Sequence, residues 1–401
     1  MNYSRREWLS AVMAAPAALA ASNKIPWDLK ALMRPPAWKP AEEERSDGVK
    51  GLFYDSVPWK GKPTRVFAWY GVPEGKSKAP AMVLIHGGGG TAFAEWVRLW
   101  NGRGYAAIAM DTCGATNGKP DPKQPLYQFE KPRHATGGPP GWGGFDQIDQ
   151  APEDQWTYHA VSAAILAHSL VRSFPEVDPK RVGLTGISWG GYLTSIVASL
   201  DSRFRFAAPV YGCGFLGDDS FWVPTFAKMG AEKARRWFDL WDPSRYLARA
   251  HCPMLWVNGT NDFAYPLSSY QRSYRLPRGP RTLSIRVRMP HGHPPGMTPK
   301  EIHTFAESVL NKGLPLTRIR SSGVAGNEAW ARFESKRLIV KAELNFTSQS
   351  GSWPHRRWET AAGGLENGRA SAPIPPSATA FYLNLVDDSG MVVSTEHVAR
   401  A

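Results

Sequence analysis

The sequence feature that most constrains the fold is the stretch GISWGG at residues 186–191. A short apolar run at residues 181–184 precedes it, and apolar residues recur at helical spacing over residues 189–200. This pattern predicts a buried strand that turns sharply into a helix, with Ser188 at the turn. The glycines on either side permit such a turn, because residues without a Cβ let the backbone pass closely and leave the serine hydroxyl free. The pattern therefore points to a nucleophilic serine at a strand–helix junction.

Strand-like apolar runs alternate with helix-like stretches along most of the chain. The runs are residues 81–85, 105–110, 181–184, 206–210, 254–257 and 283–287, and the helical stretches include 92–100, 154–173 and 299–310. Such alternation predicts an α/β fold whose mostly parallel sheet is flanked by helices. A loosely alternating stretch at residues 47–72 predicts antiparallel strands at its start. We therefore expect one catalytic domain over residues 47–313.

Two insertions interrupt this rhythm, at about residues 116–155 and 214–249. The first is rich in Pro and Gly, and the second carries several tryptophans around one expected short helix. Both follow the carboxyl ends of predicted strands, the edge of an open α/β sheet where ligands bind. We interpret them as pocket walls, with Trp142 and Trp222 as candidate substrate-binding residues.

The pattern changes again after residue 313. Residues 338–346 and 380–386 alternate with period two, and a turn at residues 387–390 leads to another apolar run at 391–393. This predicts a small antiparallel β-sandwich over residues 325–401. The segment holds no cluster of residues suited to chemistry.

The N-terminal 22 residues have the features of a twin-arginine-type export signal. Arg5 and Arg6 precede an apolar run that ends in small residues near position 20, although Trp8 stands where such signals usually have Phe. The expected location is therefore periplasmic or extracellular. No other stretch reaches 18 apolar residues, so we expect no stable membrane insertion after cleavage. The formal charge of +13 is scattered and has no long basic run, which argues against nucleic acid as a partner.

Candidate partners for the serine follow it in the chain. A serine hydroxyl needs an adjacent base, and the base needs an orienting acid. Asp262 follows the strand at residues 254–257, and His291 follows the last strand. His293 is the alternative base, but His291 lies nearer the strand end and is favoured. The two histidines could also bind a metal, but no third ligand stands at a telling spacing, so we predict no metal and no cofactor.

A glycine run, HGGGG at residues 86–90, directly follows the strand at residues 81–85. Such a run allows backbone N–H groups to turn towards a reacting carbonyl. Gly87, Gly88 and the N–H of Trp189 are therefore the predicted oxyanion hole.

Together these motifs resemble the α/β-hydrolases, close to the acetyl xylan esterase, dienelactone hydrolase and prolyl-oligopeptidase-like group. The resemblance implies a triad of Ser188, Asp262 and His291. The chain departs from dienelactone hydrolases, which have Cys where Ser188 stands, and it lacks the large N-terminal segment of prolyl oligopeptidases.

The resulting expectation is a secreted serine esterase that cleaves short acyl esters, with acetyl groups on a polysaccharide as the expected substrate. Two alternatives stay open. One is a serine exopeptidase, in which Glu153 or Asp154 would hold the substrate amine. The other is a non-catalytic, glycan-binding module that keeps only the hydrolase scaffold.

Overall fold

The structure is a computed structural model that describes residues 25–75, 77–116 and 132–400. The predicted export signal at residues 1–22 therefore lies outside the described residues, and the first insertion is described at residue 116 and from residue 132 onward. No helix within the described ranges has the length and apolar character needed to cross a membrane.

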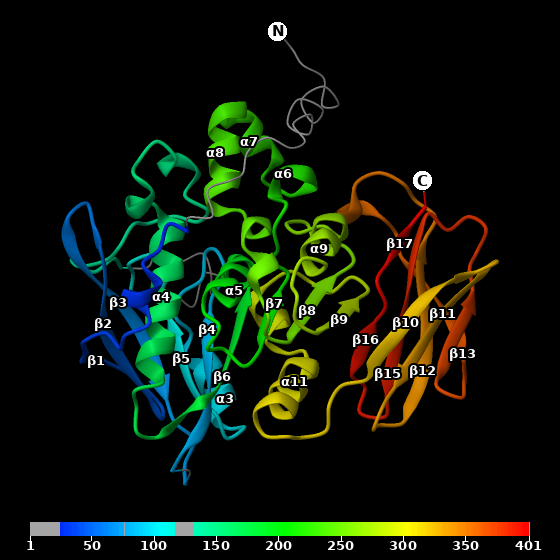
Figure 1. Ribbon diagram of the computed structural model, residues 1–401, viewed down its shortest axis with the longest axis horizontal. Coiled ribbons are helices and arrows are strands. Elements are labelled where there is room, and N and C mark those ends of the chain that lie inside the picture. Colours follow the sequence, from blue (N-terminus) through cyan, green and yellow to red (C-terminus); the bar gives the residue numbers. More distant parts are fainter. Residues whose placement is uncertain (1–24, 76, 117–131, 401) are drawn as a thin grey trace, which may run out of the picture.

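In the described residues, nine strands form the large sheet of the first domain, in the order β1-β2-β3-β5-β4-β6-β7-β8-β9 (Figure 1). Strands β1 to β3 are antiparallel and β3 pairs antiparallel with β5, whereas β4 to β9 run parallel. The strands are β1 (Trp38–Ser46), β2 (Val49–Trp59), β3 (Lys62–Gly71), β4 (Ala79–Ile85), β5 (Ala106–Met110), β6 (Val177–Ile187), β7 (Ala207–Val210), β8 (Met254–Gly259) and β9 (Arg281–Arg286). This is the mostly parallel α/β sheet that the alternation predicts.

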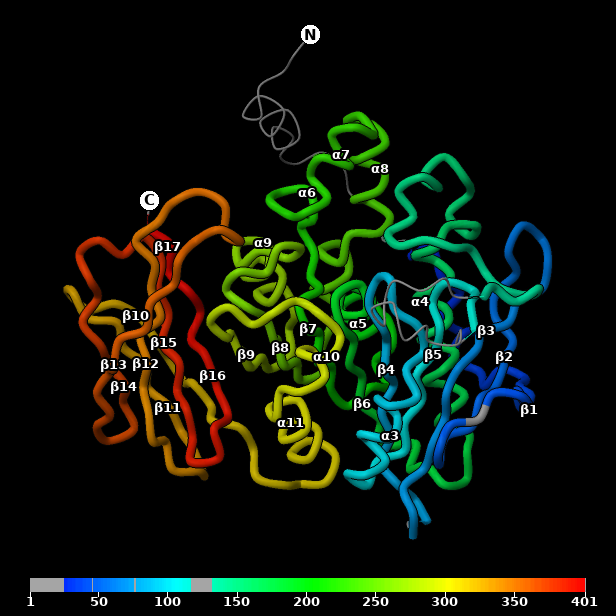
Figure 2. The backbone as a smooth tube through the Cα atoms, turned by 180° about the vertical axis from the view of Figure 1, so that it is seen from behind, coloured from blue at the N-terminus to red at the C-terminus, as the bar shows by residue number. Residues whose placement is uncertain are grey.

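Helices cover both faces of this sheet. Helices α4 and α5 lie on one face and α3 and α11 on the other (Figures 1 and 2). The helices are α2 (Leu29–Leu32), α3 (Ala94–Asn101), α4 (Trp156–Val171), α5 (Trp189–Leu200), α9 (Leu267–Tyr274), α10 (His293–Met297) and α11 (Lys300–Leu310). Every residue of β4 and of α5 is buried, so the centre of the sheet and the helix after Ser188 form the core.

The second insertion is more helical than the single short helix that the sequence predicts. Residues 214–249, all of which are described, contain α6 (Leu216–Asp219), α7 (Val223–Met229) and α8 (Ala231–Trp241). In α8 the buried residues Ala234, Trp237 and Trp241 recur at three- and four-residue spacing, and Gly230 at φ 83° separates it from α7. The prediction of a single short helix was wrong because Trp237 and Trp241, which we interpreted as part of a pocket wall, form the apolar face of a longer helix.

The two insertions are joined to each other through these tryptophans. The indole of Trp237 donates to the Gly143 carbonyl at 2.7 Å, and that of Trp241 donates to the Gln155 side chain at 2.7 Å. Both rings are fully buried, so they act as packing groups within the wall.

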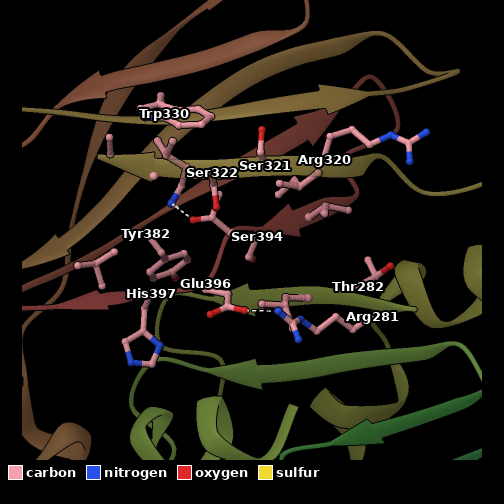
Figure 3. A pocket seen from close by; sticks show the side chains of 18 of the residues that line it. Arg281, Thr282, Arg320, Ser321, Ser322, Trp330, Tyr382, Ser394, Glu396 and His397 are labelled. Carbon is pink, nitrogen blue, oxygen red and sulfur yellow. Dashed lines mark hydrogen bonds and ion pairs between the residues drawn. The ribbon is translucent and has the colours of Figure 1, made fainter. Parts of the chain in front are cut away.

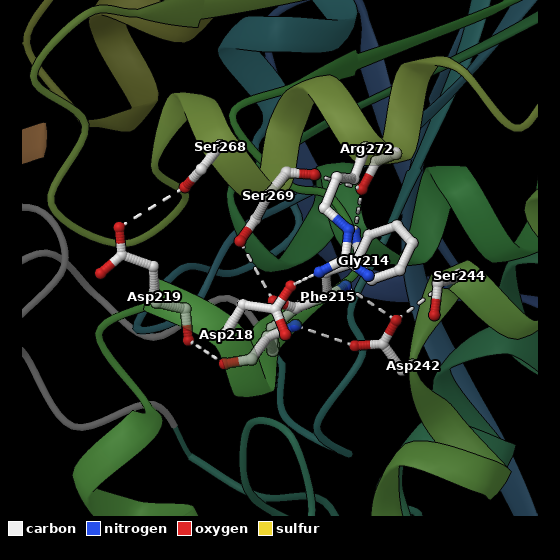
Figure 4. A network of polar contacts seen from close by, with 12 residues as sticks. Gly214, Phe215, Asp218, Asp219, Asp242, Ser244, Ser268, Ser269 and Arg272 are labelled. Atoms are coloured by element: carbon white, nitrogen blue, oxygen red, sulfur yellow. Dashed lines mark hydrogen bonds and ion pairs between the residues drawn. The ribbon is translucent and has the colours of Figure 1, made fainter. Parts of the chain in front are cut away.

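A polar network fixes the second insertion to α9 (Figure 4). The buried Asp242 carboxylate accepts the backbone N–H groups of Phe215, Leu216 and Ser244 at 2.9–3.0 Å. Burial raises the pKa of Asp242, and these hydrogen bonds oppose that rise. From α9, Arg272 pairs with Asp218 and lies over the Phe215 ring. The network therefore fixes the path of the chain as it leaves β7.

The C-terminal domain is an antiparallel sandwich, as the sequence predicts. Its eight described strands are β10 (Arg318–Ala325), β11 (Glu328–Glu334), β12 (Ile339–Thr347), β13 (Glu359–Glu366), β14 (Arg369–Pro373), β15 (Ala380–Asp387), β16 (Val392–Ser394) and β17 (Val398–Ala399). Strand β13 pairs with β12 along its first half and with β14 along its second, so it passes from one layer to the other. Leu344, Phe381 and Leu383 pack against alanines of β11 and β14 between the layers.

The sandwich covers the open edge of the large sheet at β9. The Ser394 hydroxyl accepts the Ile285 N–H at 2.7 Å, and the Asn384 amide donates to the Ile285 carbonyl at 3.1 Å. Arg286 pairs with the fully buried Glu301 of α11, whose carboxylate also accepts the Val392 N–H at 2.6 Å. An uncovered edge strand is a site for unwanted pairing, so these contacts protect it.

Candidate active site

Ser188 stands between the last residue of β6 and the first residue of α5. Its backbone is held at φ 58° and ψ −118°, a region that L-residues rarely adopt. The turn is tightly enclosed, because a Cβ added at Gly190 would lie 2.0 Å from the Ile85 carbonyl oxygen. The sequence therefore forms a strained elbow here, since only glycine fits at Gly190.

The three side chains that the chain order predicted to converge lie in hydrogen-bond contact. His291 Nε2 is 2.9 Å from Ser188 Oγ, and His291 Nδ1 is 2.6 Å from Asp262 Oδ2. Because a carboxylate only accepts, Nδ1 carries the proton and leaves Nε2 free to accept one from the serine. The other Asp262 oxygen accepts the N–H groups of Ala264 and Tyr265 at 2.9 and 2.7 Å. Asp262 thus forms a local turn and also orients the imidazole.

Aromatic rings that sequence reasoning missed surround His291. The Tyr211 ring stacks on the imidazole at 4.5 Å, and its hydroxyl donates to the Pro290 carbonyl at 2.8 Å. The Phe263 ring lies 4.8 Å from the imidazole on another side. Tyr211 directly follows β7 and Phe263 directly follows Asp262. Their positions at strand ends were the signal that could have identified them.

His293, the alternative base, occupies a different environment. Its ring packs against Phe93 at 4.0 Å and Trp96 at 4.9 Å. Neither ring nitrogen has a hydrogen-bond partner among the described residues. Burial lowers the pKa of His293 well below its usual value. The structure thus places His291, and not His293, in contact with Ser188.

The glycine run lies against the elbow. A Cβ on Gly87 would lie 3.1 Å from Ser188 Cβ, and one on Gly88 would lie 2.6 Å from Trp189 Cδ1. Trp189 is the first residue of α5, where backbone N–H groups have no acceptor within the helix. The predicted oxyanion-hole residues are therefore adjacent to Ser188.

His86 supports this run as a structural residue. Its Nε2 accepts the Thr112 N–H at 3.1 Å, so Nδ1 carries the proton and donates to the Gly87 carbonyl at 2.9 Å. These contacts fix the orientation of the Gly87 peptide.

Trp142 and Trp222 both lie beside the elbow. Trp222 contacts the Trp189 ring at 4.6 Å, and Trp142 lies 3.7 Å from the position of a Cβ on Gly88. Beyond them, Phe221 and Phe263 pack edge to face at 5.5 Å with 60% and 50% of their surfaces exposed. These two rings form an exposed aromatic surface next to the His291 loop.

The sandwich contacts both loops that carry the histidine and its carboxylate. The Asn261 amide donates to the carbonyls of Pro354 and Arg356 at 3.0 and 2.7 Å. Arg288, three residues before His291, donates to the Trp358 carbonyl at 3.0 Å. The C-terminal domain therefore supports the site, a role that the sequence did not reveal. Among the residues that the structure describes, no group of three His, Cys, Asp or Glu side chains is placed to hold a metal ion.

Comparisons with known proteins support the fold and a family resemblance. The profile of the acetyl xylan esterase family matches residues 45–235. The acetyl xylan esterase of Paenibacillus sp. R4 superposes with a TM-score of 0.55 at 23% identity, over 75% of this chain and 99% of that one. The chain has the α/β-hydrolase fold, and it resembles the acetyl xylan esterases. The family match supports a serine carboxylic-ester hydrolase.

Two further proteins are similar to this chain. Acetyl xylan esterase 1 of Thermoanaerobacterium sp. JW/SL YS485 has a TM-score of 0.53 at 18% identity, over 72% of this chain and 95% of that one. The uncharacterized peptidase YuxL of Bacillus subtilis (strain 168) is 25% identical over 213 residues. That stretch is 50% of this chain but only 28% of YuxL, so this chain spans less than a third of that relative.

Proposed function

We propose that this α/β-hydrolase removes short acyl groups, acetyl above all, from a polysaccharide outside the cytoplasm. The hydrogen-bonded series from Ser188 through His291 to Asp262 is the observation that carries the proposal. The match to the acetyl xylan esterase family supports the ester as the bond that is cleaved.

In the proposed first half-reaction, Ser188 Oγ attacks the ester carbonyl while His291 Nε2 takes its proton. Asp262 holds the imidazole in the correct tautomer and stabilises the imidazolium. The N–H groups of Gly87 or Gly88 and of Trp189 bind the oxyanion, and one such donor contributes about 10²–10³ in rate. His291 then returns the proton to the leaving alcohol. In the second half-reaction, water attacks the acyl-enzyme with His291 as the base and releases the acid.

The surroundings of Ser188 support a short acyl group and a large alcohol. Trp142 and Trp189 lie against Gly88 of the expected oxyanion hole, and Trp222 packs on Trp189, so these rings would limit the space for the acyl group. Phe221 packs against Trp222 and Phe263 against His291, and both rings are exposed, so flat sugar faces can stack on them. This asymmetry favours acetyl esters of a glycan over long-chain esters.

Export through the twin-arginine-type signal is part of the proposal. Replacing Arg5 and Arg6 with lysines should retain the protein inside the cell, and fractionation would measure this. If the variant were exported as well as the wild-type protein, the proposed export signal would be contradicted but the proposed hydrolysis would not.

The test of the function compares acetate release from acetylated xylan with anilide release from aminoacyl anilides. We expect the protein to hydrolyse the acetylated glycan. In Ser188→Ala the rate should fall by at least about 10⁴-fold, roughly as in other serine triads, while the thermal transition of the variant stays normal. His291→Gln should lose comparable activity.

Two results would favour the alternatives. Preferential cleavage of anilides would support the exopeptidase, although Asp154 already accepts the Lys60 N–H at 2.7 Å. Failure of Ser188 to react with a fluorophosphonate probe would support the non-catalytic module.

A further inference from the structure

A cleft between the two domains has the features of a second binding site (Figure 3). It has a volume of 530 Å³, which is within the range of ligand pockets. One wall comes from β9 and the other from β10, β11 and the segment after β16. No residue of the Ser188 site lines it.

The cleft combines an aromatic face with polar groups. Trp330 projects outward from β11, because its neighbours Ala329 and Ala331 are the residues that turn into the sandwich core. Its ring lies over Gly323 of the paired strand, where a Cβ would meet the ring at 3.2 Å. Ser321 and Ser322 of β10 and Thr282 of β9 add hydroxyl groups to the walls. Aromatic faces bordered by hydroxyl groups suit a sugar ring.

The cleft is also strongly basic. Its described lining contains four arginines and one glutamate, a formal surplus of three positive charges. Glu396 is shared by Arg275 and Arg281, so two guanidinium groups are held at one wall by a single carboxylate. On the other wall Arg320 pairs with Glu334, and the exposed Arg318 lies opposite Glu334 in the strand register. Both arginines lower the pKa of Glu334, so two guanidinium groups share one carboxylate on this wall too.

We propose that this cleft binds an acidic oligosaccharide, with a sugar ring against Trp330 and a uronic acid carboxylate between the arginines of the two walls. Arginine is suited to this role because its planar fork matches a carboxylate. Such a site would hold the hydrolase on an anionic polysaccharide and would give the sandwich and part of the chain's positive charge a function. Binding does not require hydrolysis, so the proposal stands independently of the proposed esterase activity.

The test measures binding by calorimetry to the full-length Ser188→Ala protein, because this substitution prevents turnover of the probes. The probes are xylo-oligosaccharides of equal length, with and without a glucuronic acid branch, and polyglutamate as a non-sugar anion. We expect the acidic oligosaccharide to bind at least tenfold more tightly than the neutral one, with an affinity that falls as salt rises. Polyglutamate should bind more weakly than the acidic oligosaccharide.

Variants separate the two contributions. Trp330→Ala should weaken the binding of both oligosaccharides, acidic and neutral, by about tenfold, as expected for loss of an aromatic contact. Arg318→Gln should weaken the binding of the acidic oligosaccharide only, and it should reduce the salt dependence of that binding. Arg332→Gln is the matched control, because Arg332 is exposed on the same face of β11 but lies outside the cleft.

Several outcomes would overturn the proposal. They are equal binding of acidic and neutral sugars, unchanged affinity in Trp330→Ala, an equal effect of Arg332→Gln, and polyglutamate binding as tightly as the acidic sugar. The last outcome would identify a surface for acidic protein segments instead.

Discussion

Replacing Ser188 with glycine should increase stability while it abolishes hydrolysis. The serine is held at φ 58° and ψ −118°, where a side chain is strained by about 1–3 kcal/mol. Glycine adopts this backbone without strain but loses about 0.5–1 kcal/mol through its greater freedom in the unfolded chain. The expected net gain is therefore at most about 2.5 kcal/mol in the free energy of unfolding, with a midpoint of about 1 kcal/mol, measured against Ser188→Ala.

Ser188→Ala is the correct reference because it loses the same hydroxyl contact with His291 but keeps the Cβ. Denaturant titration of the two inactive variants gives the difference directly, provided both show one cooperative transition with equal slopes. In a protein of this length the gain corresponds to about 1–2 °C in the unfolding temperature. If the glycine variant is no more stable than the alanine variant, the elbow is not strained and the reasoning fails.

The remaining predictions concern the residues around the elbow and one buried histidine. Gly88→Ala should lower kcat by about 10²-fold, because its Cβ would lie 2.6 Å from Trp189 Cδ1 and displace the oxyanion donors; an unchanged kcat would exclude this strand end from the hole. His293→Phe should keep hydrolysis and raise the free energy of unfolding by about 1–3 kcal/mol, because it removes two ring nitrogens that have no partner among the described residues; a loss of stability in denaturant titration would contradict this. Asn261→Ala should lower kcat about tenfold with little change in KM, because the loop that carries Asp262 loses its hydrogen bonds to the sandwich. An unchanged kcat would show that this loop keeps its conformation without the sandwich. Burial lowers the pKa of the His168 imidazole to about 4, so between pH 6.5 and 4 the unfolded chain binds more protons at this residue than the folded chain does. The contribution of His168 to stability should therefore be complete above pH 6.5 and fall by about 3 kcal/mol towards pH 4. Denaturant unfolding at each pH should show a smaller fall in His168→Gln.

The arrangement of the sheet could be predicted from the sequence because its strands are buried on both faces. Residues of β4 and β8 form uninterrupted apolar runs, which alternate with helical patterns, and that alternation has few physical solutions. A parallel sheet also brings the carboxyl ends of its strands to one edge. The proximity of Ser188 and Asp262 could therefore be inferred from chain order alone.

The finer features of the site depend on contacts that no local pattern records. His291 and His293 are two residues apart in one loop, and only the packing of His293 against Phe93 and Trp96 separates them. Tyr211 and Phe263 contact His291 from other strands. The helices of the second insertion were underestimated for a related reason, since tryptophans at helical spacing are equally typical of pocket walls.

The sandwich illustrates how a domain without candidate catalytic residues can support a candidate active site. Covering β9 requires hydrogen bonds from Ser394 and Asn384 to the Ile285 backbone. That same docking brings the segment before β13 against the ends of β8 and β9, where Asn261 and Arg288 bind its carbonyl groups. The loops of Asp262 and His291 lie at those strand ends, so one interface both protects the edge of the sheet and orders the two loops. A substitution that loosens this interface should therefore alter kcat before it unfolds either domain, because catalytic geometry tolerates displacements of less than about 1 Å.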